Sequence, residues 1–589
     1  MSAAKAWVRA LELTASIPRN PERILSTVVE GFVSYAGEKI ALISDTECLT
    51  YSALAGRTNQ YSRWALGEGI AKGEVVCLLM PNRPEFVAVW LGIANTGGVT
   101  ALLNTNLTGA QLAHCINVVS PRHVIVDAPL IDHFLTALPD LTVIPIVWAY
   151  GHTNTSFCRI DLALERYDSA MLTQTERRQV TINDRALCIY TSGTTGLPKA
   201  ANISHARVMH WSHWFCGMMG VQATDRMFTC LPMYHSVGGV LAPGAMLVAG
   251  GSVAISERFS ASRFWSDVAK WRCTLIQYIG ELCRYLLDTP PSPHDTGHQI
   301  RMACGNGLAW DIWDRFQDRF RIPAILEFYA ATEGGVSLFN VEGERGSIGR
   351  VPPYLAHRFS PALVKFDAGK GEPIRNEEGF CVRGAPGEIG EAIGPVRSSE
   401  SNTGSRFEGY TDPNATEKKL LKNVFETGDV WVRTGDLMRI DTRGFFYFVD
   451  RTGDTYRWKG ENVATTEISA AILAFPGIRH ASVYGVAIPF TDGRAGMAAL
   501  VAERALDLHA FRRYLTDRLP RYALPLFLRI RDEMEVTETW KYSKIDLVED
   551  GYDPASTADA IYFDDPETKA FVRVDRALYD RLRTGGVRL

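Results

Sequence analysis

The chain has 589 residues, of which 46% are hydrophobic, and a net charge of −4 from 62 basic and 66 acidic side chains. This length excludes a single small domain and supplies enough apolar residues for large cores, while the balanced charge argues against a nucleic-acid-binding protein. Eleven dispersed cysteines with no CxxC pair indicate reduced thiols in a cytoplasmic protein rather than a disulfide framework.

The N-terminal segment, residues 1–20, does not read as a signal peptide, because Arg9 and Glu12 interrupt its apolar run. Trp7, Val8 and Leu11 share one face of a predicted short helix. We expect this face to dock on the protein's own surface rather than on lipid.

The longest apolar stretch, Gly238–Ile255, holds five glycines and a proline. It predicts a glycine-rich helix that leads into a strand, not a membrane span. The sequence therefore predicts a cytoplasmic protein with no signal peptide or transmembrane span, and it leaves peripheral contact with a membrane open.

From about residue 50 to residue 330, short apolar runs alternate with helical patterns such as Glu85–Asn95 and Gly109–Val118. This alternation predicts parallel α/β layers. The predicted strands are Val75–Met80, Val99–Leu103, His123–Asp127, Val143–Trp148, Ala186–Tyr190, Met227–Leu231, Ser252–Ser256, Thr274–Ile279, Arg301–Cys304 and Ile325–Tyr329.

After Gly349 the pattern changes to glycine and proline turns around short β-runs that end in Phe445–Val449, which predicts a β-rich subdomain. A last segment restarts with a helix near Thr465–Phe475. The predicted fold class is α/β: a large N-terminal domain of α/β layers plus the β-rich subdomain (residues 1–450), followed by a small mobile α+β C-terminal domain (residues 451–589).

The loop Tyr190–Lys199, with the sequence YTSGTTGLPK, follows a predicted strand directly. Two glycines let backbone N–H groups turn toward an anion, four hydroxyl groups add donors, and a lysine adds charge. The spacing does not fit the GxxxxGK[ST] P-loop. A plain glycine-rich turn would need neither the hydroxyls nor the lysine, so we expect phosphate binding here.

Together with later segments, this loop resembles the phosphate motif of the acyl-adenylate-forming superfamily. Tyr329–Glu333 (YAATE) resembles its YxxTE segment, and Thr434–Asp436 (TGD) resembles its TGD segment. Asp450–Glu467 is similar to the signature of the fatty acid transport protein/very-long-chain acyl-CoA synthetase branch. Further segments that fit this branch are Gly305–Leu308, Glu327–Tyr329, Ser337–Asn340 and Leu519–Ala523. The resemblance runs from about residue 25 to the C-terminus.

The resemblance implies an ATP-dependent acid:CoA ligase that forms an acyl-adenylate and passes the acyl group to CoA, with a long or very long chain fatty acid as substrate. It implies Mg²⁺ held by Thr194 and Glu333, with oxygen ligands that suit this ion. It places ATP against Thr191, Ser192, Gly193, Thr194, Thr195, Gly196, Lys199, Gly305, Asn306, Gly307, Tyr329, Thr332, Glu333, Asp436, Arg451 and Lys541.

The same resemblance puts Tyr234 and His235 beside the acid, and we assign His235 a substrate-lining role rather than that of a general base. Lys541 would reach the carboxylate and the α-phosphate, with Lys544 as its competitor. The segment Lys459, Gly460 and Glu461 would face CoA, and a hinge would lie near Gly453. His210 and His213 form HxxH, but no third ligand is evident, so we interpret them as structural.

Two positions depart from the branch: Thr108 and Ala309 stand where arginine is usual. Both lose a cation, which leaves the exact acid open. By resemblance, fatty acids of long or very long chain lead, and steroid side-chain and bile acids are the alternatives. The sequence also leaves open a carrier-protein acceptor and a fatty-acid uptake protein, acting by or without thioesterification.

Overall fold

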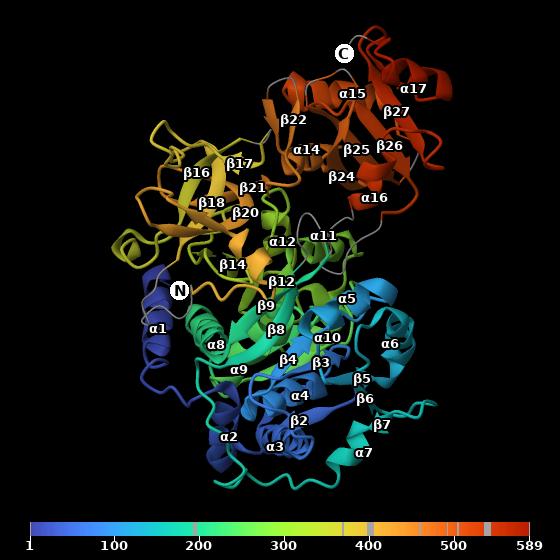
Figure 1. Ribbon diagram of the computed structural model, residues 1–589. Coiled ribbons are helices and arrows are strands. Elements are labelled where there is room, and N and C mark those ends of the chain that lie inside the picture. The colour runs from blue at the N-terminus through green and yellow to red at the C-terminus, as the bar shows by residue number, and fades with distance from the viewer. Residues whose placement is uncertain are drawn as a thin grey trace. The chain divides into compact units, whose positions relative to one another are not determined.

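The protein is described here as a computed structural model, which covers residues 2–191, 197–367, 370–396, 406–458, 461–489, 491, 493–503, 506–534 and 544–587 (Figure 1). The chain forms two compact units. Unit 1 comprises Met1–Phe359, Gly394–Lys422 and Val430–Val432, and unit 2 comprises Ser360–Ile393, Asn423–Asp429 and Arg433–Leu589. The predicted domain boundary at residue 450 and the mobility of the C-terminal domain stay predictions.

Unit 1 contains two large sheets whose central strands are parallel and fully buried, as expected for sheets covered on both faces. The eight-stranded sheet has the order β15-β14-β13-β12-β10-β11-β1-β2, and the seven-stranded sheet the order β7-β6-β5-β3-β4-β8-β9. Their strands are β1 (Ile40–Ile43), β2 (Cys48–Thr50), β3 (Val75–Leu79), β4 (Val99–Leu102), β5 (His123–Asp127), β6 (Ile146–Tyr150), β7 (Cys158–Arg159), β8 (Arg185–Thr191), β9 (Lys199–Ser204), β10 (Arg226–Thr229), β11 (Ser252–Ile255), β12 (Leu275–Ile279), β13 (Met302–Asn306), β14 (Ile325–Ala330) and β15 (Ser337–Asn340).

Helices connect the parallel strands, as parallel pairing requires; two further helices precede the first strand of these sheets and one follows the last. They are α1 (Ala3–Ala15), α2 (Leu25–Ala36), α3 (Tyr51–Gly67), α4 (Pro84–Asn95), α5 (Gly109–Val119), α6 (Ile131–Ala137), α7 (Ile160–Leu164), α8 (His205–Met219), α9 (Ala242–Leu247), α10 (Phe264–Lys270), α11 (Gly280–Asp288), α12 (Trp313–Arg319) and α13 (Pro413–Glu417).

The predicted α/β layers are confirmed, and most predicted strands fall within two residues of the observed ones. The strand predicted at Val143–Trp148 begins three residues later than expected. Val143 and Ile144 are 70% and 72% exposed in the loop before β6, and the strand begins only at Ile146. Pro145 explains the shift, because a proline has no N–H to donate within a sheet.

The glycine-rich stretch forms a π-helical turn, η3 (Val237–Leu241), then α9 and β11, which confirms a helix leading into a strand. Within the described residues, no helix combines the length and the apolar character needed to cross a bilayer.

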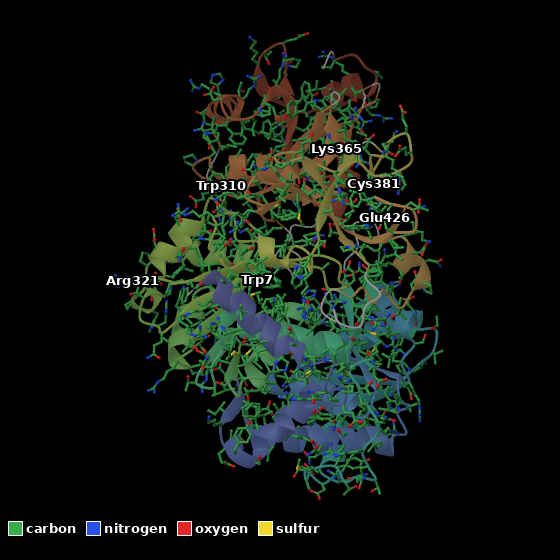
Figure 2. All side chains as sticks on the ribbon, turned by 90° about the vertical axis from the view of Figure 1, so that its left-hand side faces the viewer. Trp7, Trp310, Arg321, Lys365, Cys381 and Glu426 are labelled. Atoms are coloured by element: carbon green, nitrogen blue, oxygen red, sulfur yellow. The ribbon has the colours of Figure 1, made fainter. Side chains whose placement is uncertain are left out.

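Helix α1 docks on α8, as its apolar face predicts (Figure 1). The ring of Trp7, labelled in Figure 2, lies 5.7 Å from that of Trp214 and 5.8 Å from that of Phe339. A side chain at Gly217 would stand 2.5 Å from the Cα of Ala10, so the two helix backbones approach closely. Val8, on the edge of this face, remains exposed.

The β-rich segment predicted after Gly349 contains short, mostly antiparallel strands. They are β16 (Ala362–Asp367), β17 (Glu372–Pro373), β18 (Ile389–Pro395), β19 (Leu420–Lys422), β20 (Val430–Ile440) and β21 (Phe446–Arg451).

The C-terminal part of unit 2 has a hairpin, β22 (Tyr456–Trp458) with β23 (Glu461–Val463), and a five-stranded sheet in the order β24-β25-β26-β27-β28. Tyr456, Val483 and Phe527 belong to its own hydrophobic core. The elements are β24 (Ile478–Ala487), β25 (Arg494–Ala502), β26 (Phe527–Arg531), β27 (Ala560–Asp565), β28 (Ala570–Arg573), α14 (Thr465–Leu473), α15 (Leu508–Thr516), α16 (Ile545–Asp550) and α17 (Arg576–Arg583).

Candidate active site

The predicted phosphate loop joins two neighbouring strands of the seven-stranded sheet. Thr191 ends β8 and pairs with Lys199, which begins the antiparallel β9. Ser192, Gly193, Thr194, Thr195 and Gly196 lie outside the described residues. The loop therefore starts at the carboxyl end of a parallel strand, where ligands bind in open α/β sheets.

Glu333 lies in the loop between β14 and β15 and is only 7% exposed. Its Oε1 accepts a hydrogen bond of 2.7 Å from the Tyr410 hydroxyl and lies 3.0 Å from the Lys419 Nζ. Burial alone would raise the pKa of this carboxyl, but the Lys419 ammonium and the hydrogen bonds outweigh it and hold the pKa below its ordinary value. Glu333 is thus a buried carboxylate that stays ionised.

Tyr410 also connects Glu333 to the phosphate loop, because the Lys199 Nζ lies 5.8 Å from the centroid of the Tyr410 ring. Lys199 begins β9, and Tyr410 lies between β18 and α13. Within unit 1, the structure therefore brings the predicted lysine of the phosphate loop and the predicted metal ligand to the same tyrosine.

A buried arginine holds the backbone around Glu333. Arg207, in the first turn of α8, donates from Nη1 to the carbonyl oxygens of Glu333 (3.0 Å) and Arg406 (2.9 Å). Ser204, the N-cap of α8, donates to the Glu408 carboxylate. Helix α8 thereby fixes the loop of Glu333 and the segment of Tyr410 relative to each other.

The predicted adenine-contacting residues lie at adjacent carboxyl ends of parallel strands. Gly305 and Asn306 end β13, Gly307 follows it, and Tyr329 lies near the end of the neighbouring β14. A side chain at Gly305 would stand 2.2 Å from the carbonyl oxygen of Tyr278, so only glycine fits there.

Tyr234 and His235 follow β10, with ring centroids 4.6 Å apart. Asn82 orders the preceding loop: its Nδ2 donates to the carbonyl oxygens of Leu231 and Ser256, and its Oδ1 accepts from the N–H of Met233. Ser236 follows His235, and its hydroxyl oxygen lies 3.3 Å from the hydroxyl oxygen of Thr332. The predicted acid-lining segment and the predicted phosphate contact are thus neighbours.

Asp436 and Arg451 occupy paired positions of β20 and β21 in unit 2, and the Arg451 Nε lies 3.9 Å from Asp436 Oδ1. Gly435 has φ +77°, which favours glycine, and its N–H donates to the buried Glu391 carboxylate. The predicted ribose ligand and its partner arginine therefore belong to one local structure.

Gly453 lies in the turn after β21. The Nζ of Lys544 contacts Asp454 Oδ2 and the Thr465 hydroxyl, both at 3.2 Å. Lys459, Gly460 and Lys541 lie outside the described residues; the backbone of Glu461 begins β23, and its side chain is likewise outside them. Lys544 is thus engaged by residues of unit 2, and the assignment of Lys541 stays a prediction.

The chemistry of Glu333 fits Mg²⁺, because a buried ionised carboxylate is a hard oxygen donor. Among the described residues no group of three or more His, Cys, Asp or Glu side chains is placed to hold a metal. His213 is buried and His210 stacks on Trp214, as the structural interpretation of HxxH expects.

Sequence reasoning missed Tyr410, Lys419, Arg207 and Asn82. No spacing rule connects Glu333 with Tyr410, which is 77 residues away. A buried arginine and a buried asparagine leave no periodic signal either. The two departures from the branch lie in different places. Thr108 is the N-cap residue of α5. Ala309 is followed by Trp310, whose side chain is 71% exposed and is labelled in Figure 2.

Comparison with known proteins matches residues 30–389 to the family described as "AMP-binding enzyme". This chain belongs to the AMP-binding enzyme family. It is 40% identical to long-chain fatty acid transport protein 6 of Mus musculus over 575 residues, covering 96% of this chain and 92% of the relative. It is also 40% identical to long-chain fatty acid transport protein 3 of Homo sapiens over 527 residues, covering 88% and 76%.

Solved structures share the fold of this AMP-binding enzyme. The anthranilate CoA ligase AuaEII in complex with anthranoyl-AMP superposes with a TM-score of 0.76 at 18% identity, covering 89% of this chain and 96% of that chain. ATP-bound MatB from Rhodopseudomonas palustris gives a TM-score of 0.73 at 23% identity, covering 89% and 98%. The predicted fold class is confirmed.

Proposed function

We propose that this protein is an ATP-dependent fatty acid:CoA ligase that acts on long or very long chain acids through an acyl-adenylate. The family membership and the relatives described as long-chain fatty acid transport proteins support this function. The observation that carries it is the cluster of Glu333, Tyr410, Lys419 and Lys199, which holds an ionised carboxylate beside the predicted phosphate loop.

A carboxylic acid is a poor acyl donor, because hydroxide is a poor leaving group. Attack of the acid's carboxylate oxygen on the α-phosphorus of ATP expels pyrophosphate and gives an acyl-AMP, whose leaving group is AMP. This attack brings two anions together, so fixed donors and cations lower its barrier most. Lys199, Lys541 and the donors of the Thr191–Lys199 loop are the groups we assign to this task.

In this proposal Glu333 and Thr194 hold Mg²⁺, which neutralises phosphate charge when bound. Tyr329 and Gly305–Gly307 receive adenine, and Thr332 contacts the α-phosphate. Asp436 accepts the ribose hydroxyls with Arg451 beside it, as a carboxylate suits paired O–H donors.

Tyr234 and His235 line the acid, and Lys459, Gly460 and Glu461 face CoA in the second half-reaction. The CoA thiol sulfur then attacks the acyl carbon of acyl-AMP, and AMP leaves with the bonding electrons. The thiol proton passes to solvent. A cytoplasmic location with peripheral membrane contact would let the ligase trap incoming acids, because the charged thioester does not recross a bilayer readily.

The test is a steady-state kcat/KM panel from acetate to C24 acids, with a steroid side-chain acid and a bile acid included, at saturating ATP, Mg²⁺ and CoA. We expect the highest kcat/KM for acids of long or very long chain. A steroid side-chain or bile acid as best substrate would favour the second candidate, a steroid side-chain or bile acid:CoA ligase. Failure of every acid to support ATP–pyrophosphate exchange would overturn ligation and favour uptake without catalysis.

A further inference from the structure

Glu327, in β14, is a carboxyl side chain only 2% exposed, although acidic side chains are almost never buried without partners. Both oxygens of its carboxyl group accept hydrogen bonds. Oε1 accepts hydrogen bonds from the backbone N–H of Gly307 and from that of Leu308, the latter at 3.2 Å. Oε2 accepts one from the Tyr278 hydroxyl.

The loop that Glu327 holds is the one that ends β13. Gly305 pairs with Glu327 across the parallel strands, so the carboxyl starts level with the strand end and reaches the two N–H groups beyond it. Gly307 has φ +82°, in the left-handed region that favours glycine.

The other side of this loop rests on backbone. A side chain at Gly280, the first residue of α11, would stand 1.6 Å from the carbonyl oxygen of Gly307. The turn at Gly307 therefore packs closely against the backbone of Gly280 and is hydrogen-bonded to the Glu327 carboxyl.

Glu327 also precedes Tyr329 by two residues on the same strand, so side chains at both positions point to the same side of the sheet. A single short segment thus carries the proposed stacking residue for adenine and the carboxyl that orders the proposed adenine loop. We propose that Glu327 is the positioning residue for adenine recognition: it fixes the Gly305–Gly307 loop through Gly307 and Leu308, which rests on the ATP site proposed above.

The experiment compares two full-length variants of nearly equal volume. Glu327→Gln keeps an oxygen acceptor for the two N–H groups, whereas Glu327→Met fills the space without one. Binding of ATP is measured calorimetrically without acid, and tripolyphosphate, which lacks a base, is measured as a competitor. We expect Glu327→Met to weaken ATP binding about tenfold or more, because two N–H groups lose their acceptor, and Glu327→Gln to stay within about twofold of wild type.

Tripolyphosphate binding should remain at its wild-type level in both variants. Unchanged ATP affinity in Glu327→Met, equal losses in the Gln and Met variants, or an equal loss for tripolyphosphate would each overturn the positioning role. Should Glu327→Met not fold, Tyr278→Phe decides: removing the hydroxyl that orients Oε2 should weaken ATP binding about threefold, and no change would contradict the proposal. A wild-type protein that binds ATP but forms no acyl-CoA would overturn the ligase function and leave this role intact.

Discussion

The Glu333 carboxyl combines burial with charge, two properties that oppose each other. Its ionisation depends on Lys419 and Tyr410, which come from a segment far along the chain. A carboxylate stabilised in this way is available as a metal ligand at neutral pH without first losing a proton. Glu327, six residues earlier, has the opposite behaviour: among the described residues no cation contacts it, and burial raises its pKa to about 8.

That raised pKa predicts a pH-dependent stability. Below its ordinary pKa near 4.5 the carboxyl is protonated in both folded and unfolded chains, and its contribution is fully present. Between about pH 4.5 and 8 only the folded chain keeps the proton, so stability falls as pH rises, by up to about 1.4 kcal/mol per pH unit. Burial raises the pKa of Tyr278, Cys283 and Cys304 nearby, so these groups stay neutral in this window.

The measurement is the thermal midpoint at pH 5.5 and pH 8 for wild type and Glu327→Gln. The wild type should lose more stability than the variant between the two values, since glutamine does not titrate. Equal losses would show that Glu327 does not hold a proton in the folded state.

A second prediction at the residue scale compares alanine variants of Lys541 and Lys544. Lys541→Ala should reduce adenylate formation by about 10²–10³-fold or more, because it removes a cation from the proposed transition state, while thioester formation from preformed acyl-AMP is largely spared. Lys544→Ala is the matched control, since its ammonium is engaged by Asp454 and Thr465. The measurement is a single-turnover assay of each half-reaction for both variants. An equal loss in both half-reactions for Lys541→Ala would refute its role.

At the scale of elements, α8 connects the core to the site. Its first turn supplies Arg207 to the Glu333 loop, and its C-terminal half receives α1 at Gly217. The helical spacing of apolar residues predicted that α1 docks on the protein's own surface, because Trp7 lies on its apolar face. The same spacing could not predict that α1 packs against α8, because α8 has apolar residues on every face.

Gly217→Ala should therefore push α1 away from α8. The new methyl group would meet the Ala10 backbone at 2.5 Å, which is rigid within its helix, and overpacking of this kind costs about 1–3 kcal/mol. Hydrogen exchange of residues 3–15 should accelerate and the thermal midpoint should fall. Gly31→Ala in α2 is the control, because nothing lies within 4 Å of the added group. Wild-type exchange in Gly217→Ala would mean that the helices accommodate the methyl.

At the scale of the whole molecule, the chain folds into two units, and the proposed site residues are divided between them. Glu333, Tyr329 and Lys199 belong to unit 1, while Asp436 and Arg451 belong to unit 2. The proposed reaction has two half-reactions with different requirements. We propose that residues 451–589 rotate as a rigid body between them, about a few backbone dihedrals near Gly453, a pivot that lies within unit 2 and not at its boundary with unit 1.

Gly453→Pro tests this hinge. Proline fixes φ near −65° and removes the N–H, so we expect the variant to keep one orientation and to slow overall turnover by about tenfold or more. The measurement is steady-state acyl-CoA formation beside each half-reaction alone, of which one should remain near wild type. Wild-type overall turnover would reject Gly453 as the pivot.

The local sequence by itself determined the parallel strands, the helix at the N-terminus and the loops that carry the family motifs. These features depend on neighbouring residues only: each strand or helix is an apolar run bounded by turn residues, and each motif is a continuous stretch of the chain. Only the tertiary structure decided that Tyr410 and Lys419 meet Glu333, that Arg207 joins two loops, and that Glu327 holds the turn at Gly307. Such contacts depend on which strands and helices become neighbours in the packed core, and no local spacing rule extends that far.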